Sequence, residues 1–114
     1  MAKQEENLND GLLTFGKIQT VRGKNNKIDK SADPFNEMGK LYFNFKTIRQ
    51  DDVEQYGGKR KVVDLKVKSY YLPDVLKTHK VKIEEELYDI NAVDPDTQRK
   101  YMYWYLSKAE GGSI

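Results

Sequence analysis

The chain has 114 residues with a net charge of +2, one histidine and no cysteine. Its length suits one domain, which can bury roughly two-thirds of its unfolded surface without disulfide support. The lack of cysteine excludes disulfide frameworks, thiol nucleophiles and cysteine-based zinc sites, and one histidine leaves little for a histidine metal site or a serine hydrolase. We therefore expect a protein that is not an enzyme, with no catalytic residue, no metal ligand and no cofactor.

The start of the chain is polar and lacks the apolar segment of a signal peptide. No apolar stretch approaches the roughly 18 residues needed to cross a bilayer. We expect a protein made in the cytoplasm with no membrane association. Residues 1–10 and 110–114 are expected to be flexible tails, and residues 11–109 a single domain.

The first half of this domain predicts two strands with a long polar stretch between them. Residues 12–22 are rich in Thr, Val and Ile and predict a strand. Residues 23–39 predict a loop of a length that is uncommon in compact domains and typical of functional or mobile segments. Residues 41–48 alternate apolar with polar side chains, which predicts a half-buried second strand. Its inward face holds Leu41, Phe43 and Phe45.

The next part of the chain predicts a third and a fourth strand joined by a crossing segment. The third strand covers residues 61–71 and stops before Pro73, because proline cannot donate to a strand ladder. Residues 73–78 then cross to a short fourth strand that contains Val81 and Ile83. The inward face of the third strand holds Val63, Leu65 and Val67.

The last part of the chain predicts two more strands. An acidic corner at residues 84–86 turns into a fifth strand over residues 87–93. Residues 94–97 have the chemistry of a type I turn, with Asp first and Pro second, and the last strand covers residues 100–106. With no sustained helical period, the sequence predicts an all-β fold: a small six-stranded, mostly antiparallel β-barrel or sandwich with long early loops.

The last strand is apolar or aromatic on both faces, whereas a strand at the rim of a sheet normally alternates with polar residues. One face can line the core, and we expect the other face to be covered by another copy of the chain. The sequence therefore indicates an assembly protein. The residues assigned to the core and to subunit contact are Tyr101, Met102, Tyr103, Trp104 and Tyr105.

An ordered set of segments carries a family resemblance over residues 12–108. Residues 78–83 read Thr-His-Lys-Val-Lys-Ile, an acidic turn follows, and then come Leu-Tyr-Asp-Ile at 87–90, Val-Asp-Pro-Asp at 93–96 and Arg-Lys at 99–100. This set resembles the head-tail joining proteins of tailed phages, also called head completion or stopper proteins. Two places depart from that pattern: Glu84-Glu85-Glu86 stands where the family has a glycine turn, and Tyr70-Tyr71 stands where it has Arg-Tyr.

The resemblance implies a homo-oligomeric ring in the virion, in register with the twelve-fold portal of the head. One side of the ring would contact the portal or its adaptor, and the other side would receive the tail proteins. The double-stranded phage genome would pass through the channel, and a loop from each subunit would close it after packaging. The protein would be made in the cytoplasm of the host bacterium.

The segment between the second and third strands is the candidate gate that this resemblance implies. Its glycines allow a sharp bend, its acidic half would repel DNA and its basic half would attract phosphate. A solvated hairpin loop is the alternative interpretation. The gate residues are Asp51, Asp52, Val53, Glu54, Gln55, Tyr56, Gly57 and Gly58, and the possible DNA-facing residues are Lys59, Arg60 and Lys61.

Two other functions remain open from the sequence. Tyr101, Tyr103 and Trp104 could stack the bases of single-stranded nucleic acid on a small barrel. A ring protein of the tail, such as a tail-completion protein, would have a similar strand composition.

The remaining polar candidates are expected to have ordinary structural roles. His79 is expected at the surface or in a turn, and Asp94 and Asp96 are expected to cap a turn rather than to bind a metal. A basic cluster could face a neighbouring subunit or the genome, and ordinary solvation is the interpretation that we favour. Its residues are Lys17, Arg22, Lys24, Lys27 and Lys30.

Overall fold

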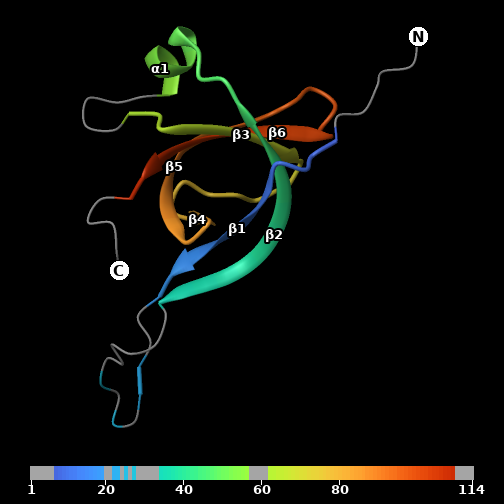
Figure 1. Cartoon of the computed structure of the whole chain (residues 1–114). Helices are drawn as coiled ribbons and strands as arrows, with labels where there is room; N and C mark the ends of the chain where they lie inside the picture. The colour runs from blue at the N-terminus through green and yellow to red at the C-terminus, as the bar shows by residue number, and fades with distance from the viewer. Residues whose placement is uncertain are drawn as a thin grey trace.

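The computed structural model describes residues 7–19, 22–23, 25, 27, 34–56 and 62–109. These residues form six strands and one short helix (Figure 1). In chain order the elements are β1 (Gly11–Ile18), β2 (Phe35–Lys46), α1 (Gln50–Tyr56), β3 (Leu65–Tyr70), β4 (Lys80–Ile83), β5 (Glu86–Pro95) and β6 (Tyr101–Lys108).

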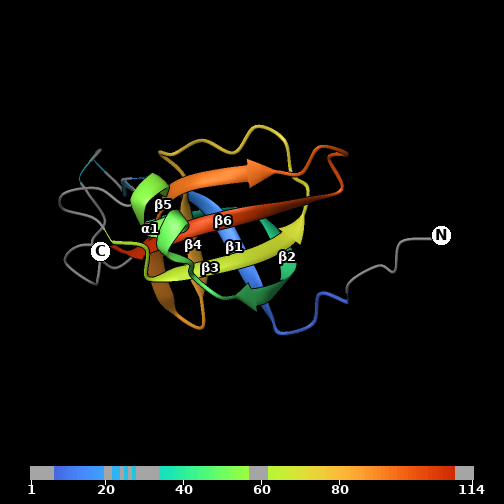
Figure 2. The ribbon, with the colours of Figure 1, turned by 90° about the horizontal axis from the view of Figure 1, so that it is seen from above.

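The strands form one antiparallel sheet that closes on itself in the order β1-β2-β3-β6-β5-β4 (Figures 1 and 2). Closure comes from the pairing of β4 with β1, which joins Phe15 to Val81. The prediction of a six-stranded, mostly antiparallel all-β fold is confirmed. Because the sheet is closed, β6 has a neighbour on each side, β3 and β5, and does not form a rim.

The segment between β3 and β4 crosses one end of the barrel, since β3 and β4 lie on opposite sides of it. Leu72 donates its backbone N–H to Met102 Sδ at 3.2 Å, and Leu76 donates its own to His79 Nδ1 at 3.1 Å. His79 is buried, and its ring meets the edge of Phe15. His79 is therefore not at the surface, because this crossing segment folds the ring against the end of the core, but it does lie in a turn, since its backbone N–H donates to the carbonyl of Leu76 at 3.0 Å.

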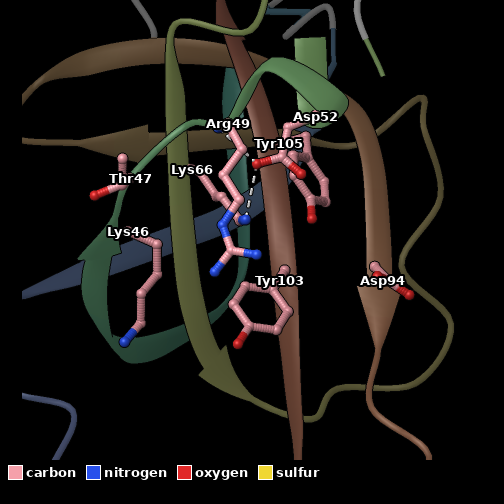
Figure 3. Close-up of a pocket in the computed structure, with 8 residues that line it drawn as sticks. All are labelled: Lys46, Thr47, Arg49, Asp52, Lys66, Asp94, Tyr103 and Tyr105. Carbon is pink, nitrogen blue, oxygen red and sulfur yellow. Dashed lines mark hydrogen bonds and ion pairs between the residues drawn. The ribbon is translucent and has the colours of Figure 1, made fainter. Parts of the chain in front are cut away.

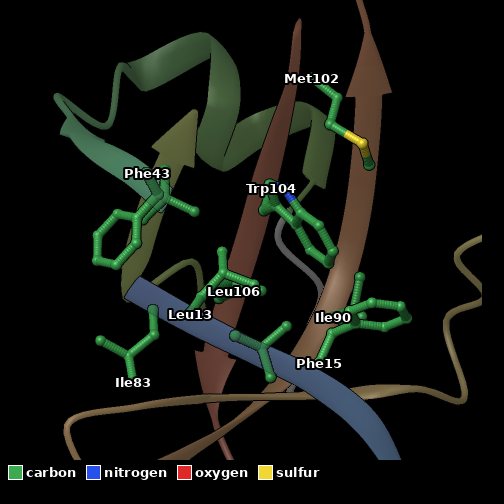
Figure 4. Close-up of a cluster of buried hydrophobic side chains, with 10 residues drawn as sticks. Leu13, Phe15, Phe43, Ile83, Ile90, Met102, Trp104 and Leu106 are labelled. Atoms are coloured by element: carbon green, nitrogen blue, oxygen red, sulfur yellow. The ribbon is translucent and has the colours of Figure 1, made fainter. Parts of the chain in front are cut away.

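The interior of the barrel is filled by apolar side chains from all six strands (Figure 4). Trp104 lies fully buried in their midst. Its indole N–H donates to Ser69 Oγ at 2.7 Å, so its polar atom is satisfied inside the core. The core residues are Leu13, Phe15, Phe43, Val67, Val81, Ile83, Ile90, Met102, Trp104 and Leu106.

The first loop lies earlier in the chain than expected, because β1 ends at Ile18 and β2 begins at Phe35 and not near Leu41. The added part of β2 pairs with the second half of β1 beyond a bulge at Phe15 and Gly16. A Cβ on Gly16 would lie 2.1 Å from the carbonyl oxygen of Asn36, so only glycine allows the two strands this close there. The register of β2 therefore depends on a glycine in the facing strand.

Two hairpin turns join the last three strands. Glu84 and Glu85 form the tip between β4 and β5, with φ of 51° and 69°. The predicted type I turn at residues 94–97 is wrong in position, since Pro95 is the last residue of β5 and pairs with Met102. The carboxylate of Asp96 instead accepts the backbone N–H of Lys100 at 2.8 Å, so Asp96 does cap the turn.

Candidate functional site

The two faces of β6 are both covered within one chain. Met102, Trp104 and Leu106 face the interior and have at most 1% of their surface exposed. On the outer face, Tyr101 is 9% and Tyr105 is 3% exposed. The chain itself therefore covers these two residues, for which another copy was the expected cover.

The cover on the outer face comes from β3. The ring of Tyr70 stacks on Tyr101 with 5.5 Å between the ring centroids. Lys68 Nζ lies 4.4 Å from the centroid of Tyr101, and Lys66 Nζ lies 5.1 Å from that of Tyr103. Long lysine stems can cover apolar surface while the ammonium sits over an aromatic face, and Lys66 and Lys68 cover the tyrosines in this way.

The same geometry argues against base stacking on this strand. Trp104 lies inside the barrel and bonds to Ser69, so its ring cannot reach a nucleic-acid base without opening the core. Tyr101 is already stacked on Tyr70. Of the three proposed stacking residues, Tyr103 alone retains partial exposure on the outer face.

The predicted gate contains a helix. Residues 50–56 form α1, whereas the sequence predicts a loop, and Gly57, Gly58, Lys59, Arg60 and Lys61 lie outside the described residues. The helix begins where Asp52 accepts the backbone N–H of Arg49 at 2.9 Å, as in half of a capping box. The helix carries Asp51, Val53 and Glu54 as exposed side chains.

Asp52 ties α1 to the barrel through a buried ion pair. Its carboxylate accepts a hydrogen bond of 2.9 Å from Lys66 Nζ, and both residues are less than 9% exposed. Burial alone would raise the pKa of Asp52. The hydrogen bonds from Lys66 and from the Arg49 N–H, with the charges of these two residues, outweigh burial and hold the pKa below its ordinary value.

A polar pocket of about 430 Å³ opens beside this ion pair on the outside of the barrel (Figure 3). Tyr103 and Tyr105 of β6 line it together with Lys66, and the Arg49 side chain is directed into it. Asp94 of β5 lies on the side of the pocket opposite Lys46 (Figure 3). The sequence does not predict this site, because its residues come from five elements separated along the chain. The lining residues are Lys46, Thr47, Arg49, Asp52, Lys66, Asp94, Tyr103 and Tyr105.

An exposed apolar strip runs across the outside of β1, β2 and β3. Leu12 pairs with Tyr42, and these residues are 42% and 62% exposed. On the neighbouring strands β2 and β3, Phe43 pairs with Ser69, and both side chains point into the barrel. Because side chains alternate along a strand, Tyr42 and Tyr70, which are the next residues on β2 and β3, lie on the outside. This strip therefore leaves apolar surface uncovered, whereas none of the exposed large apolar residues in the described part of the chain belongs to β6.

The segment before β1 is held against β2. Asn44 Oδ1 accepts the backbone N–H of Asn9 at 2.8 Å and that of Asp10 at 3.1 Å. Asp10 in turn accepts the N–H of Phe45 at 2.9 Å, and Leu8 is buried. The last four residues of the expected N-terminal tail thus lie along the end of β2.

The other polar candidates do not converge on a site. Lys17, Arg22 and Lys27 are exposed, while Lys24 and Lys30 lie outside the described residues. In the described part of the chain, no cluster of three or more histidine and acidic residues could hold a metal ion. No helix within those same ranges is long and apolar enough to span a bilayer.

Comparison with known proteins gives a fold but no family. No protein family and no curated protein sequence matches the chain. The fold is similar to the solution structure of protein SF1141 from Shigella flexneri 2a, with a TM-score of 0.64 at 12% identity over 90% of this chain and 95% of that one. It is also similar to a chain from the virion of a native gene transfer agent particle, with a TM-score of 0.54 at 13% identity over 91% of this chain and 96% of that one.

Proposed function

We propose that this chain is a virion subunit of the head-tail connector type, a stopper that forms a homo-oligomeric ring beneath the portal or its adaptor. The observation that carries the proposal is the likeness to a chain of the gene transfer agent virion, which spans nearly the full length of both chains. The strand order predicted from the sequence resemblance points to the same class of protein. Its action would be steric and electrostatic, with no bond made or broken.

The exposed strip of Leu12, Tyr42 and Tyr70 supports assembly. Apolar surface that is contiguous and exposed on a single small domain usually marks a site of interaction with another molecule. We expect the strip to lie within a subunit contact of roughly 1,200–2,000 Å² in total, the usual size of a specific interface. The isolated chain can remain monomeric, because the head supplies the template for a twelve-fold ring and the tail proteins bind afterwards.

The gate in this proposal is α1 with the residues that follow it. The helix projects from the barrel (Figure 1) and is fixed to it by Asp52, while its acidic side chains Asp51 and Glu54 point to solvent. Twelve such helices facing a channel would repel the genome, and the basic residues Lys59, Arg60 and Lys61 would hold phosphate. The bound genome would thus be retained without tight binding.

The gate is tested by replacing residues 53–58 with a Gly-Ser linker of equal length while Asp52 is kept. We expect the subunit to fold and to enter particles, and packaged DNA to leak from the heads. The matched control is Lys77→Ala, an exposed residue on the crossing segment at the other end of the barrel. Heads that keep their genome with the linker variant would show that α1 is not the gate.

Location in the particle tests the function as a whole. Gold-labelled antibody against the chain should mark the joint between head and tail, with portal and tail proteins on either side. Label on free tails, with none on DNA-filled heads that lack tails, would instead identify a tail-completion ring. Absence of label from the particles would reject both.

A further inference from the structure

The tip of the β4–β5 hairpin is formed by two acidic residues in a strained conformation. Glu84 and Glu85 both have positive φ, which a two-residue hairpin of the I′ kind requires and which Asn-Gly normally provides. Each left-handed residue that is not glycine costs roughly 1–2 kcal/mol. The side chain of Glu85 is 91% exposed, and its 3.7 Å pair with Lys82 is a weak surface contact.

A complementary cation lies in the pocket described above. Asp52 already has Lys66 as its partner, and the Arg49 side chain forms no ion pair with any residue in the described ranges. Its guanidinium is directed into the pocket, toward the ring of Tyr103 (Figure 3). A guanidinium can hold a carboxylate through two parallel hydrogen bonds, and the Tyr103 hydroxyl can donate a third.

The two features lie at opposite ends of β5. The tip comes just before Glu86, where β5 begins, whereas Asp94 of the pocket lies next to Pro95, where β5 ends, so roughly 26 Å of extended strand separates them. The acidic tip therefore cannot reach the pocket of its own chain, but it can reach the pocket of another copy. A contact between two different surfaces of identical subunits is heterologous, and it builds a ring when the rotation closes.

We infer that the Glu84–Glu85 tip of one copy docks against Arg49 in the pocket of the next copy. This inference rests on the ring in the proposed function and names the contact that would build it. It explains why the turn carries two glutamates where glycine would relieve the strain. Asp94 on the far side of the pocket would repel a misplaced carboxylate and so direct the tip toward Arg49.

Paired cysteines test the contact, because the chain has no cysteine of its own. We expect the variant Arg49→Cys/Glu85→Cys to give a ladder of disulfide-linked oligomers on oxidation, both in particles and in concentrated purified protein. The control pair Lys77→Cys/Glu85→Cys should stay monomeric. If the first variant gives no ladder in particles that contain the protein, or if both pairs give equal ladders, the inference is wrong.

Charge exchange gives a second test. Arg49→Glu and the pair Glu84→Arg/Glu85→Arg should each weaken self-association about tenfold or more, and their combination should restore it. Fluorescence of Trp104 checks that every variant is folded. Particles that assemble normally with Glu84→Arg/Glu85→Arg would overturn the inference while leaving the connector function intact.

Nucleic acid is the competing occupant of the pocket. If Arg49→Glu lowers DNA retention without changing the cysteine ladder, the pocket contacts phosphate and the inference is wrong. If the protein is absent from particles, the connector proposal fails, whereas a ladder in purified protein would still support the contact.

Discussion

Trp104 and Ser69 are joined by a 2.7 Å hydrogen bond in the centre of the barrel, and both side chains are fully buried. Ser69 lies on β3 and Trp104 on β6, two residues apart diagonally across the ladder, since Trp104 itself pairs with Val67. A shift of one residue in this register would place the two side chains on opposite faces of the sheet and break the bond. The bond therefore helps to fix the pairing of two strands that are distant in sequence.

Replacing Ser69 by alanine tests this relationship. The change leaves the Trp104 indole N–H buried without an acceptor, so we expect the free energy of unfolding to fall by about 2 kcal/mol. Urea denaturation followed by the fluorescence of Trp104, the single tryptophan, measures the loss. The exposed control Thr78→Ala should change stability by less than about 0.5 kcal/mol. Equal stabilities for both variants would show that the indole needs no acceptor from Ser69.

The Asp52–Lys66 ion pair gives a second prediction. Asp52→Ala leaves a buried ammonium without its carboxylate, which should cost about 3 kcal/mol, the low end for a broken buried pair, because the pocket lets water reach Lys66. The double variant Asp52→Ala/Lys66→Met should recover most of this loss. Asp51→Ala, on the exposed side of α1, serves as the control. A double variant no more stable than the single one would mean that Asp52 acts without Lys66.

The lowered pKa of Asp52 predicts how stability depends on pH. The ionised carboxylate stabilises the fold at a pH above the unfolded pKa of about 3.9, and this contribution is lost as the pH falls through that value toward the lower folded pKa. Asp52→Asn has no such contribution. The gap in the free energy of unfolding between the unsubstituted chain and Asp52→Asn should be constant near pH 6–7 and should narrow below about pH 5. A gap that widens in acid would contradict the assignment.

Removing the strain at the hairpin tip should raise stability and weaken assembly. Glu84→Asn/Glu85→Gly relieves two strained residues, so we expect the free energy of unfolding to rise by about 1–2 kcal/mol while self-association weakens. Asp74→Gly is the matched control, since Asp74 has φ of 65° on the crossing segment, far from the tip. It should stabilise the fold and leave assembly unchanged. If the tip variant loses stability, the two glutamates are not strained.

The strand pattern could be predicted from sequence wherever alternation was clear. Residues 41–46 and 101–106 both lie in strands, as predicted, and Phe43 faces the core, although Phe45 of the predicted inward face is 47% exposed. The segment 35–39 was missed, because its polar side chains face solvent and its strand form depends on Gly16 in the facing strand. The helix at 50–56 spans barely two turns, too few for a helical period to appear.

The site could not be predicted, because its groups meet only when the sheet closes. Lys66 looks like an ordinary outward lysine, yet it is buried between Asp52 and the rings of Tyr103 and Tyr105. For the same reason, β6 was expected to need another copy as its cover. Sequence alternation shows which residues share a face, but it does not show which neighbour lies over that face.

Electron microscopy of particles made without this chain tests the central claim most directly. As a connector, the chain is needed to close the head and to receive the tail, so its loss should leave heads that are empty or leaking beside unattached tails. Restoring the chain should return complete tailed particles. Complete particles in its absence, with DNA-filled heads joined to tails, would contradict the proposed function.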